Sequence, residues 1–187
     1  KYMTAKEEDI LTSTNLIEQG VVITRLLESV IADPKVKLDD MLIGDKNAIM
    51  VGTRILGYGK DYGVTLVDPD TQERVEHVVD LTKLENKPID EKLFENGNNF
   101  SFELPNSKRV IGFKILTQKD ENNIAEILKD YEKVEKLTGV SYTGTTRLKH
   151  QIVSIDDNTD QKEIDKFVDN EFLALDTRAF RKHLDEI

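Results

Sequence analysis

Apolar residues in the first part of the chain recur at spacings of three and four, which is the pattern of helices with one buried face. The segment Thr4-Ala5-Lys6-Glu7 has the form of a capping box and predicts a helix that begins there. A longer apolar run follows between residues 16 and 31, with Thr14 or Asn15 as its N-terminal cap. Because Gly20 weakens the middle of this run, one helix and two helices are both compatible with it.

A further helix is predicted after a break in this pattern. Pro34 cannot continue a helix, so we expect residues 34–44 to form a connector with one helical turn at Leu38 to Leu42. Asp45 to Leu56 resumes the helical period, and its acidic first residue suits the positive end of the helix dipole. Gly57 and Gly59 can adopt the left-handed backbone that ends a helix, so the chain is expected to reverse there.

Between residues 61 and 117, alternation of apolar and polar residues replaces the helical period. It predicts two β-hairpins, of which the first has one buried face. The strands of this hairpin flank the turn Asp68-Pro69-Asp70 and contain Val64 and Leu66 before it, and Val75, His77, Val79 and Leu81 after it. The second hairpin contains Phe100 and Phe102, the turn Pro105-Asn106-Ser107 and a returning strand from Val110 to Leu116.

The C-terminal part returns to the helical period. Gln118 to Leu137 is an amphipathic helix that Gly139 closes. The secondary structure of Thr145 to Ile155 is ambiguous, because its threonines favour a strand whereas its apolar spacing also fits a helix. Two more helices are predicted at Asp160 to Leu173 and at Asp176 to Leu184. Their core positions are Ile164, Phe167, Val168, Phe172, Phe180 and Leu184.

These elements predict an α+β fold, with helical N- and C-terminal parts around a small antiparallel β centre of two hairpins. The parts are residues 1–60, residues 61–117 and residues 118–187, which we expect to form one cooperative unit. The pattern does not decide whether the two hairpins form a single sheet.

Composition limits the classes of function. The 187 residues include no cysteine, which excludes disulfides, thiolate zinc sites and cysteine nucleophiles and fits a reducing compartment. The net charge of -10 argues against a general nucleic-acid-binding surface. No apolar run is long enough to span a membrane, and the first residues lack the apolar core of a signal peptide. We therefore expect a cytosolic protein.

Candidate catalytic and metal-binding motifs are incomplete. The glycines between Gly57 and Gly63 follow a helix and precede a strand, whereas a dinucleotide fingerprint needs the opposite order. Asp156 to Asp160 supplies oxygen ligands, but the glycine and the final glutamate of a calcium loop are missing, so we expect a turn that caps the next helix through Asp160. His77, His150 and His183 lie far apart. No cofactor, no metal and no catalytic set of residues is expected; an acidic-residue hydrolase is the enzyme alternative.

Three arginines are more informative than these motifs. Arg54, Arg178 and Arg181 lie in otherwise apolar helical segments. An arginine that is buried in such a place requires an acidic or carbonyl partner. The simpler interpretation for each of them is a side chain that runs along the helix edge into solvent.

Several segments resemble a known family. They are residues 3–13, residues 44–46 and residues 54–62 in the N-terminal half, and residues 151–157, 164–168 and 175–181 in the C-terminal half. In these segments the chain resembles the T-even myophage baseplate protein family, whose members include a baseplate hub assembly component. Related tail and baseplate proteins often carry a C-P-x-C knuckle after the first strand. Here the turn is Asp68-Pro69-Asp70-Thr71, so no zinc-bound hairpin is expected.

The resemblance implies a non-enzymatic structural or assembly protein of a contractile phage tail baseplate. Its partners would be other baseplate or tail proteins, in an oligomeric assembly located in the virion and made in the host cytoplasm. The alternative is a transient assembly chaperone that is absent from the mature virion. The candidate interface residues are Arg54, Tyr58, Tyr62, Arg178 and Arg181, because tyrosine and arginine are common anchors of protein interfaces.

Overall fold

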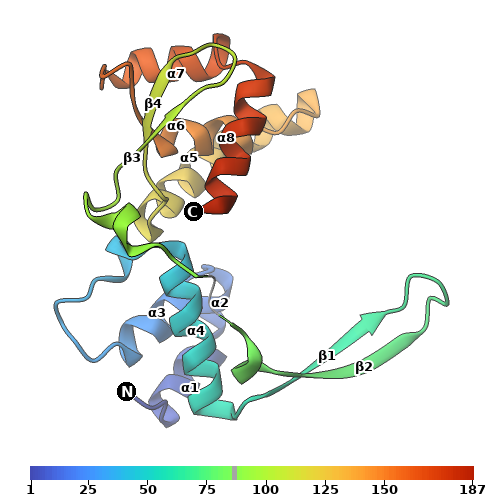
Figure 1. The fold of residues 1–187 in the computed structure, drawn as a ribbon. Coiled ribbons are helices and arrows are strands. Elements are labelled where there is room, and N and C mark those ends of the chain that lie inside the picture. Colours follow the sequence, from blue (N-terminus) through green and yellow to red (C-terminus); the bar gives the residue numbers. More distant parts are fainter. Residues whose placement is uncertain (86–87) are drawn as a thin grey trace. The chain divides into compact units, whose positions relative to one another are not determined.

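The computed structural model describes residues 1–85 and 88–187 (Figure 1). The chain has an α+β fold with helices at both ends and two small antiparallel sheets, which confirms the predicted fold class. It divides into two compact units, Lys1–Lys87 and Pro88–Ile187. In the described residues the two hairpins belong to separate sheets, one of two strands and one of three.

The first unit contains four α-helices, two 3-10 turns and one hairpin. Its elements are α1 (Ala5–Thr12), α2 (Thr14–Glu18), α3 (Val22–Val30), η1 (Leu38–Asp40), α4 (Ile43–Tyr58), β1 (Asp61–Val67), β2 (Arg74–Asp80) and η2 (Leu81–Lys83). Gly20 has a φ of +70° and separates α2 from α3, so the long apolar run forms two helices. Ser13, rather than Thr14 or Asn15, occupies the cap position before α2. The predicted turn in the connector is present as η1.

A small core holds the helices of the first unit together. Leu26, Leu27, Val30 and Leu38 are buried, and apolar side chains of α1, including Ile10 and Leu11, pack against them. The carboxylate of Glu7 is also buried. It accepts hydrogen bonds from the Thr4 amide (2.8 Å) and the Ser29 hydroxyl (3.0 Å), so the predicted capping box is present and ties α1 to α3.

Of the two glycines predicted to end α4, Gly57 and Gly59, only Gly59 does so. Gly59 is the C-terminal cap and has a φ of +85°. Gly57, in contrast, lies inside α4, and the expectation that it contributes to the chain reversal is wrong. A Cβ atom at Gly57 would lie 2.7 Å from the sulfur of Met3. The absence of a side chain there allows α4 to approach the N-terminal segment.

The first hairpin forms as predicted, but neither of its faces is buried. Seven residue pairs join β1 and β2, from Asp61 and Asp80 at the base to Val67 and Arg74 near the tip. Leu66 and Val75, which face each other, are 55% and 51% exposed. Figure 1 shows the reason, since the hairpin extends away from the helices of its own unit. The expectation of a buried face is therefore wrong for the described residues.

The second unit combines four helices with a three-stranded sheet. Its elements are η3 (Glu91–Phe94), β3 (Phe100–Glu103), β4 (Val110–Phe113), α5 (Gln118–Thr138), α6 (Thr143–Gln151), β5 (Ile152–Ile155), α7 (Gln161–Asn170) and α8 (Ala174–Glu186). The strand order is β3-β4-β5 with antiparallel pairs. The segment Thr145 to Ile155, whose secondary structure the sequence left ambiguous, thus contains both structures: the end of helix α6 and then strand β5.

An aromatic and aliphatic core fills the second unit. Its fully buried residues are Leu104, Ile111, Phe113, Leu148, Ile152, Ile155, Ile164, Phe167, Val168 and Phe180. The rings of Phe113 on β4 and Phe180 on α8 meet edge to face at 5.0 Å. Gly139 closes α5 in the left-handed conformation, and the Asp160 side chain caps α7, both as predicted. The predicted core positions Phe172 and Leu184 lie partly buried at its margin.

Candidate functional site

Arg54 is at the centre of a corner that α4, Gly59 and β1 form together. Its guanidinium carbon lies 4.9 Å from the centre of the Tyr58 ring and 5.8 Å from that of Tyr62. Its Nη1 and Nη2 groups donate to the carbonyl oxygens of Gly59 (3.2 Å) and Asp61 (3.4 Å). Tyr58 is four residues further along the same helix, whereas Tyr62 reaches Arg54 only because Gly59 turns the chain.

This arrangement leaves much of the guanidinium available for a partner. A guanidinium has five N–H donors, and the two carbonyl contacts of Arg54 use two of them. No carboxylate within residues 1–85 or 88–187 forms an ion pair with Arg54. The neighbouring rings restrict the side chain, so the remaining donors have a fixed direction before any partner binds.

A hydrogen bond to the first helix holds Tyr58 in place. The Tyr58 hydroxyl donates to Oε1 of Glu8 on α1. This bond raises the pKa of Tyr58, because loss of the phenolic proton would remove the hydrogen bond and place two negative charges together. The exposed face of the ring remains open, since Tyr58 and Tyr62 are 49% and 46% exposed.

An apolar groove of about 420 Å³ adjoins this corner. Arg54, Tyr58 and Tyr62 line it together with Met3, which precedes α1, and with side chains of α1, α3 and α4. The side chains of these helices include Leu11, Ile23, Leu26, Met50 and Val51. Methionine side chains are flexible and adapt to different partners. A groove of this kind with a few polar groups at its margin is a binding-site candidate. The groove requires three helices at once, so no local pattern in the sequence predicts it.

The other two predicted interface arginines lie in the second unit, on α8. Arg178 and Arg181 are exposed and line a shallow depression of about 540 Å³ with Leu175, Ala179, Lys182 and Asp185. The structure therefore places the five candidate residues in two groups, one in each unit: Arg54, Tyr58 and Tyr62, and Arg178 with Arg181.

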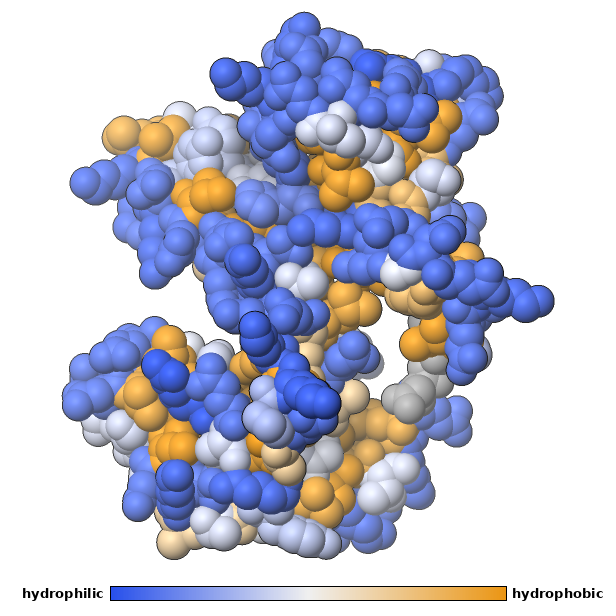
Figure 2. Space-filling model, turned by 90° about the vertical axis from the view of Figure 1, so that its left-hand side faces the viewer, coloured by the Kyte–Doolittle hydropathy of each residue, from blue (hydrophilic) through white to orange (hydrophobic). Residues whose placement is uncertain are grey.

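The surface of the protein carries both hydrophilic and apolar areas. On the face that Figure 2 shows, apolar side chains form separate patches among polar ones. Exposed apolar side chains are present on both units, and Leu137, Leu175 and Leu66 are 87%, 65% and 55% exposed. Contiguous apolar patches with polar margins are typical of surfaces that bind proteins.

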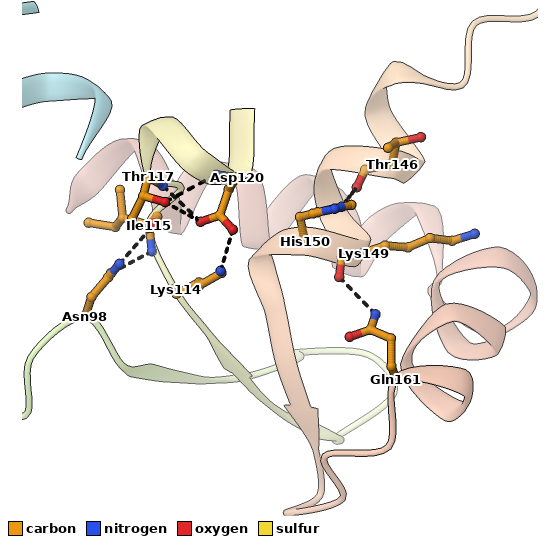
Figure 3. Close-up of polar contacts among 9 residues, drawn as sticks. All are labelled: Asn98, Lys114, Ile115, Thr117, Asp120, Thr146, Lys149, His150 and Gln161. Atoms are coloured by element: carbon orange, nitrogen blue, oxygen red, sulfur yellow. Dashed lines mark hydrogen bonds and ion pairs between the residues drawn. The ribbon is translucent and has the colours of Figure 1, made fainter. Parts of the chain in front are cut away.

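A cavity of about 540 Å³ in the second unit is lined by polar and apolar side chains and is the catalytic alternative. Figure 3 shows polar contacts of several of its residues. Its basic groups already have partners: Lys114 contacts Asp120 (2.7 Å), Lys149 contacts Asp169 (2.7 Å), and Nδ1 of His150 bonds to the Thr146 carbonyl (3.0 Å). Burial raises the pKa of Asp120, but the Lys114 and Thr117 bonds outweigh it and the net pKa is lowered. These contacts stabilise the fold, and they bring together no nucleophile, base and orienting group.

The described residues contain neither a cluster of metal-binding side chains nor a membrane-spanning helix. No group of three or more histidine, aspartate or glutamate side chains is arranged to hold a metal ion there. His77 is exposed on β2, and the ring of His183 stacks on Phe102 at 4.5 Å. No helix in residues 1–85 and 88–187 is long and apolar enough to cross a membrane.

Comparison with known protein families gave a match over most of the chain. The model of a family described as T4 bacteriophage base plate protein matches residues 1–178 of the chain, which include most of both units. No curated protein and no solved structure matches the chain.

Proposed function

Because the chain belongs to the T4 bacteriophage base plate protein family, we propose that it is a non-enzymatic structural component that binds other baseplate subunits. The observation that carries this proposal is the corner of Arg54, Tyr58 and Tyr62 beside the apolar groove. Arginine and tyrosine in a largely apolar setting are the residues that most often dominate the energy of protein interfaces.

The chemistry of the corner indicates which partner group it would bind. The fixed guanidinium of Arg54 suits a carboxylate, to which arginine can donate two parallel hydrogen bonds. The groove suits an apolar side chain next to that carboxylate. A partner segment with an acidic residue beside an apolar one would therefore satisfy both features in one contact.

Arg178 and Arg181 form the second part of the proposed interface. Both are exposed near Leu175 on α8, and the remainder of this chain is strongly acidic. A partner surface with acidic residues would gain charge complementarity with the two arginines there. The two groups of residues give the chain two separate contacts, as expected for a subunit inside a larger assembly.

The test is incorporation of tagged variants into tail complexes. In cells infected with a phage that lacks the gene, we expect Arg54→Ala to lose its co-purifying baseplate proteins, because removal of an anchor residue costs about 2 kcal/mol or more. Arg54→Lys should fail as well, since an ammonium cannot replace the planar fork of donors. The matched control is Arg25→Ala, which removes an exposed arginine that pairs with Glu28 on α3.

Normal assembly of the Arg54→Ala protein would contradict the proposal. Mass spectrometry of purified virions supplies a second measurement, because a structural component stays in the particle. Absence of the chain from finished virions would instead support the transient assembly chaperone.

A further inference from the structure

The first hairpin is a sheet of two strands, so each strand has an edge that no other strand in residues 1–85 and 88–187 occupies. In an antiparallel pair, residues that bond to the partner strand alternate with residues whose N–H and C=O groups point away from it. Two hydrogen bonds fix this alternation: the Leu81 amide donates to the Lys60 carbonyl (2.9 Å), and the Asp68 amide donates to the Glu73 carbonyl (2.9 Å). The even-numbered residues of β1 therefore bond to β2, and its odd-numbered residues point outward.

The outward groups of β1 begin beside Arg54. The Asp61 carbonyl accepts from Nη2 of Arg54 (3.4 Å), which agrees with the alternation. Gly63, Thr65 and Val67 follow along the same edge, and all are exposed. We call these residues the open edge of β1. Their N–H and C=O groups form a row without a strand partner in the described part of the chain, at the spacing that another extended chain matches.

The two edges of the hairpin differ in how well they are protected. Charged side chains, prolines and bulges are the usual devices that prevent an edge strand from pairing with another chain. Three of the four outward residues of β2 are charged. These four residues are Arg74, Glu76, Val78 and Asp80. The open edge of β1 has no charged residue and no proline, and its pairing with β2 runs without a bulge from Asp61 to Val67. It is therefore the edge that is better suited to accept a further strand.

A third strand would also remedy the weakness of a two-stranded ribbon. Isolated hairpins are at best marginally stable in water, because they bury too little apolar surface to offset the loss of chain entropy. Here β1 and β2 extend away from the helices of their unit (Figure 1). Leu66 and Val75, which face each other across the ribbon, remain more than half exposed. A strand beside β1 would cover part of this apolar face and would bond to the open edge.

We propose that the open edge of β1 pairs with an extended segment of another baseplate subunit, an inference that rests on the proposed function because it names how the partner binds. The segment supplies main-chain donors and acceptors to Gly63, Thr65 and Val67, as in other cases of strand addition. Because side chains alternate along a strand, every second residue of the segment lies on the face of Leu66 and should be apolar. The net charge of -10 opposes association of two copies, which favours a different subunit as the partner.

Two proline variants test which edge is used. Thr65 and Glu76 lie opposite each other, and the amide of each points away from the hairpin. Proline at either position removes one outward N–H and keeps the hydrogen bonds between β1 and β2. In cells infected with a phage that lacks the gene, Thr65→Pro should reduce the co-purifying baseplate proteins at least about tenfold, because a main-chain hydrogen bond is lost and the ring obstructs the edge.

Glu76→Pro is the matched control and should co-purify the same proteins as the wild type. Circular dichroism and thermal unfolding of both purified variants check that the fold persists. Arg54→Ala, the test of the proposed function, is measured beside them. If Arg54→Ala loses its partners whereas Thr65→Pro keeps them, the strand addition is wrong and the proposed function stands. If the wild type itself co-purifies no baseplate protein, the proposed function fails and the strand addition fails with it.

Hydrogen exchange of the wild-type chain supplies a measurement without a substitution. The free chain and the chain in purified tail complexes are compared by mass spectrometry with fragmentation that resolves single amides. The amides of Gly63, Thr65 and Val67 should exchange rapidly in the free chain and slowly in the complex, because strand addition gives them acceptors. The outward amides of Glu76 and Val78 should exchange rapidly in both samples.

Three results would overturn the strand addition. The first is unchanged exchange at the open edge in the complex. The second is equal protection of the outward amides of both strands, which would mean that a partner covers a face of the hairpin rather than one edge. The third is an equal loss of partners in the Thr65→Pro and Glu76→Pro proteins. Protection of the open edge in the purified chain at high concentration would assign it to a second copy instead of a different subunit.

Discussion

At the scale of residues, two carboxylates are completely buried and both connect elements. Glu7 joins α1 to α3 in the first unit, and Asp176 joins α8 to the turn between β3 and β4 in the second. Asp176 accepts from the Asn106 amide and side chain (2.8 Å each) and from the Ser107 amide (3.0 Å). A buried carboxylate that accepts from three donors is satisfied in place and serves the packing of the second unit.

Removal of the Asp176 carboxylate should therefore destabilise the second unit. We expect Asp176→Ala to lower the free energy of unfolding by about 3 kcal/mol, because it leaves buried amide donors without an acceptor. Urea unfolding, monitored by circular dichroism, measures the loss. The control is Glu132→Ala on the exposed face of α5, which should change stability by less than about 0.5 kcal/mol. A loss as small as that of the control would show that water replaces the carboxylate.

The same carboxylate makes stability depend on pH. Burial raises the pKa of Asp176, but the bonds from Asn106 and Ser107 outweigh burial and lower the pKa from 3.8 to about 2. Because the pKa is lower in the folded state, the stabilisation is complete above the unfolded value and is lost as the pH falls from about 4 through about 2. The difference in unfolding free energy between the wild type and Asp176→Ala should shrink over this range. A constant difference would contradict the assigned contacts.

At the scale of elements, the end of α4 depends on one glycine. Gly59 combines a φ of +85° with a ψ of 173°, a backbone conformation that residues with a Cβ atom rarely adopt. The chain direction of the hairpin, and with it the contact between Tyr62 and Arg54, follows from this residue.

Two glycine substitutions with opposite expected signs test that conclusion. Gly59→Ala should destabilise the first unit by about 1 to 3 kcal/mol through backbone strain, although no atom lies within 4 Å of the added Cβ. Gly52→Ala, in the middle of α4 and equally free of contacts, should stabilise it by up to about 1 kcal/mol through helix propensity. Thermal unfolding compares the two proteins. Equal shifts in the melting temperature would mean that the backbone at Gly59 is not strained.

Periodicity predicted most helices and both hairpins because each depends on local residues. The capping box at Thr4, the glycine that closes α5 and the aspartate that caps α7 are all short-range signals. The strand β5 had no such signal. Its four residues follow α6 directly, and Ile152 and Ile155 become strand residues because they pair with Phe113 and Ile111 on β4. That pairing joins positions about 40 residues apart, and no local pattern contains it.

At the scale of the whole molecule, hydrogen bonds close the tip of the first hairpin and an ion pair lies at its base. The turn from Asp68 to Thr71 closes through hydrogen bonds from the Asp70 and Thr71 amides to the Asp68 carboxylate. Ion pairing between Lys60 and Asp80 (2.8 Å) supports the base. We expect that neither EDTA nor added Zn²⁺ changes the melting temperature, because these contacts need no ligand. Calorimetry measures it, and a clear decrease with the chelator would show that a metal ion contributes.

The division of the chain into units is also a property of the whole molecule. The contacts between elements concentrate within Lys1–Lys87 and within Pro88–Ile187. The sequence showed changes of period near residues 60 and 117, because period reports the class of each element. It does not report which elements pack together.

The sequence by itself determined the class of fold, the positions of the helices and hairpins, and which side chains share a face. The tertiary structure decided what covers each face. The apolar residues of the first hairpin and of β4 alternate in the same way, yet Ile111 and Phe113 are fully buried whereas Leu66 and Val75 are more than half exposed. The physical reason is that alternation arises from local backbone geometry, whereas burial requires contact with a distant element or with another molecule.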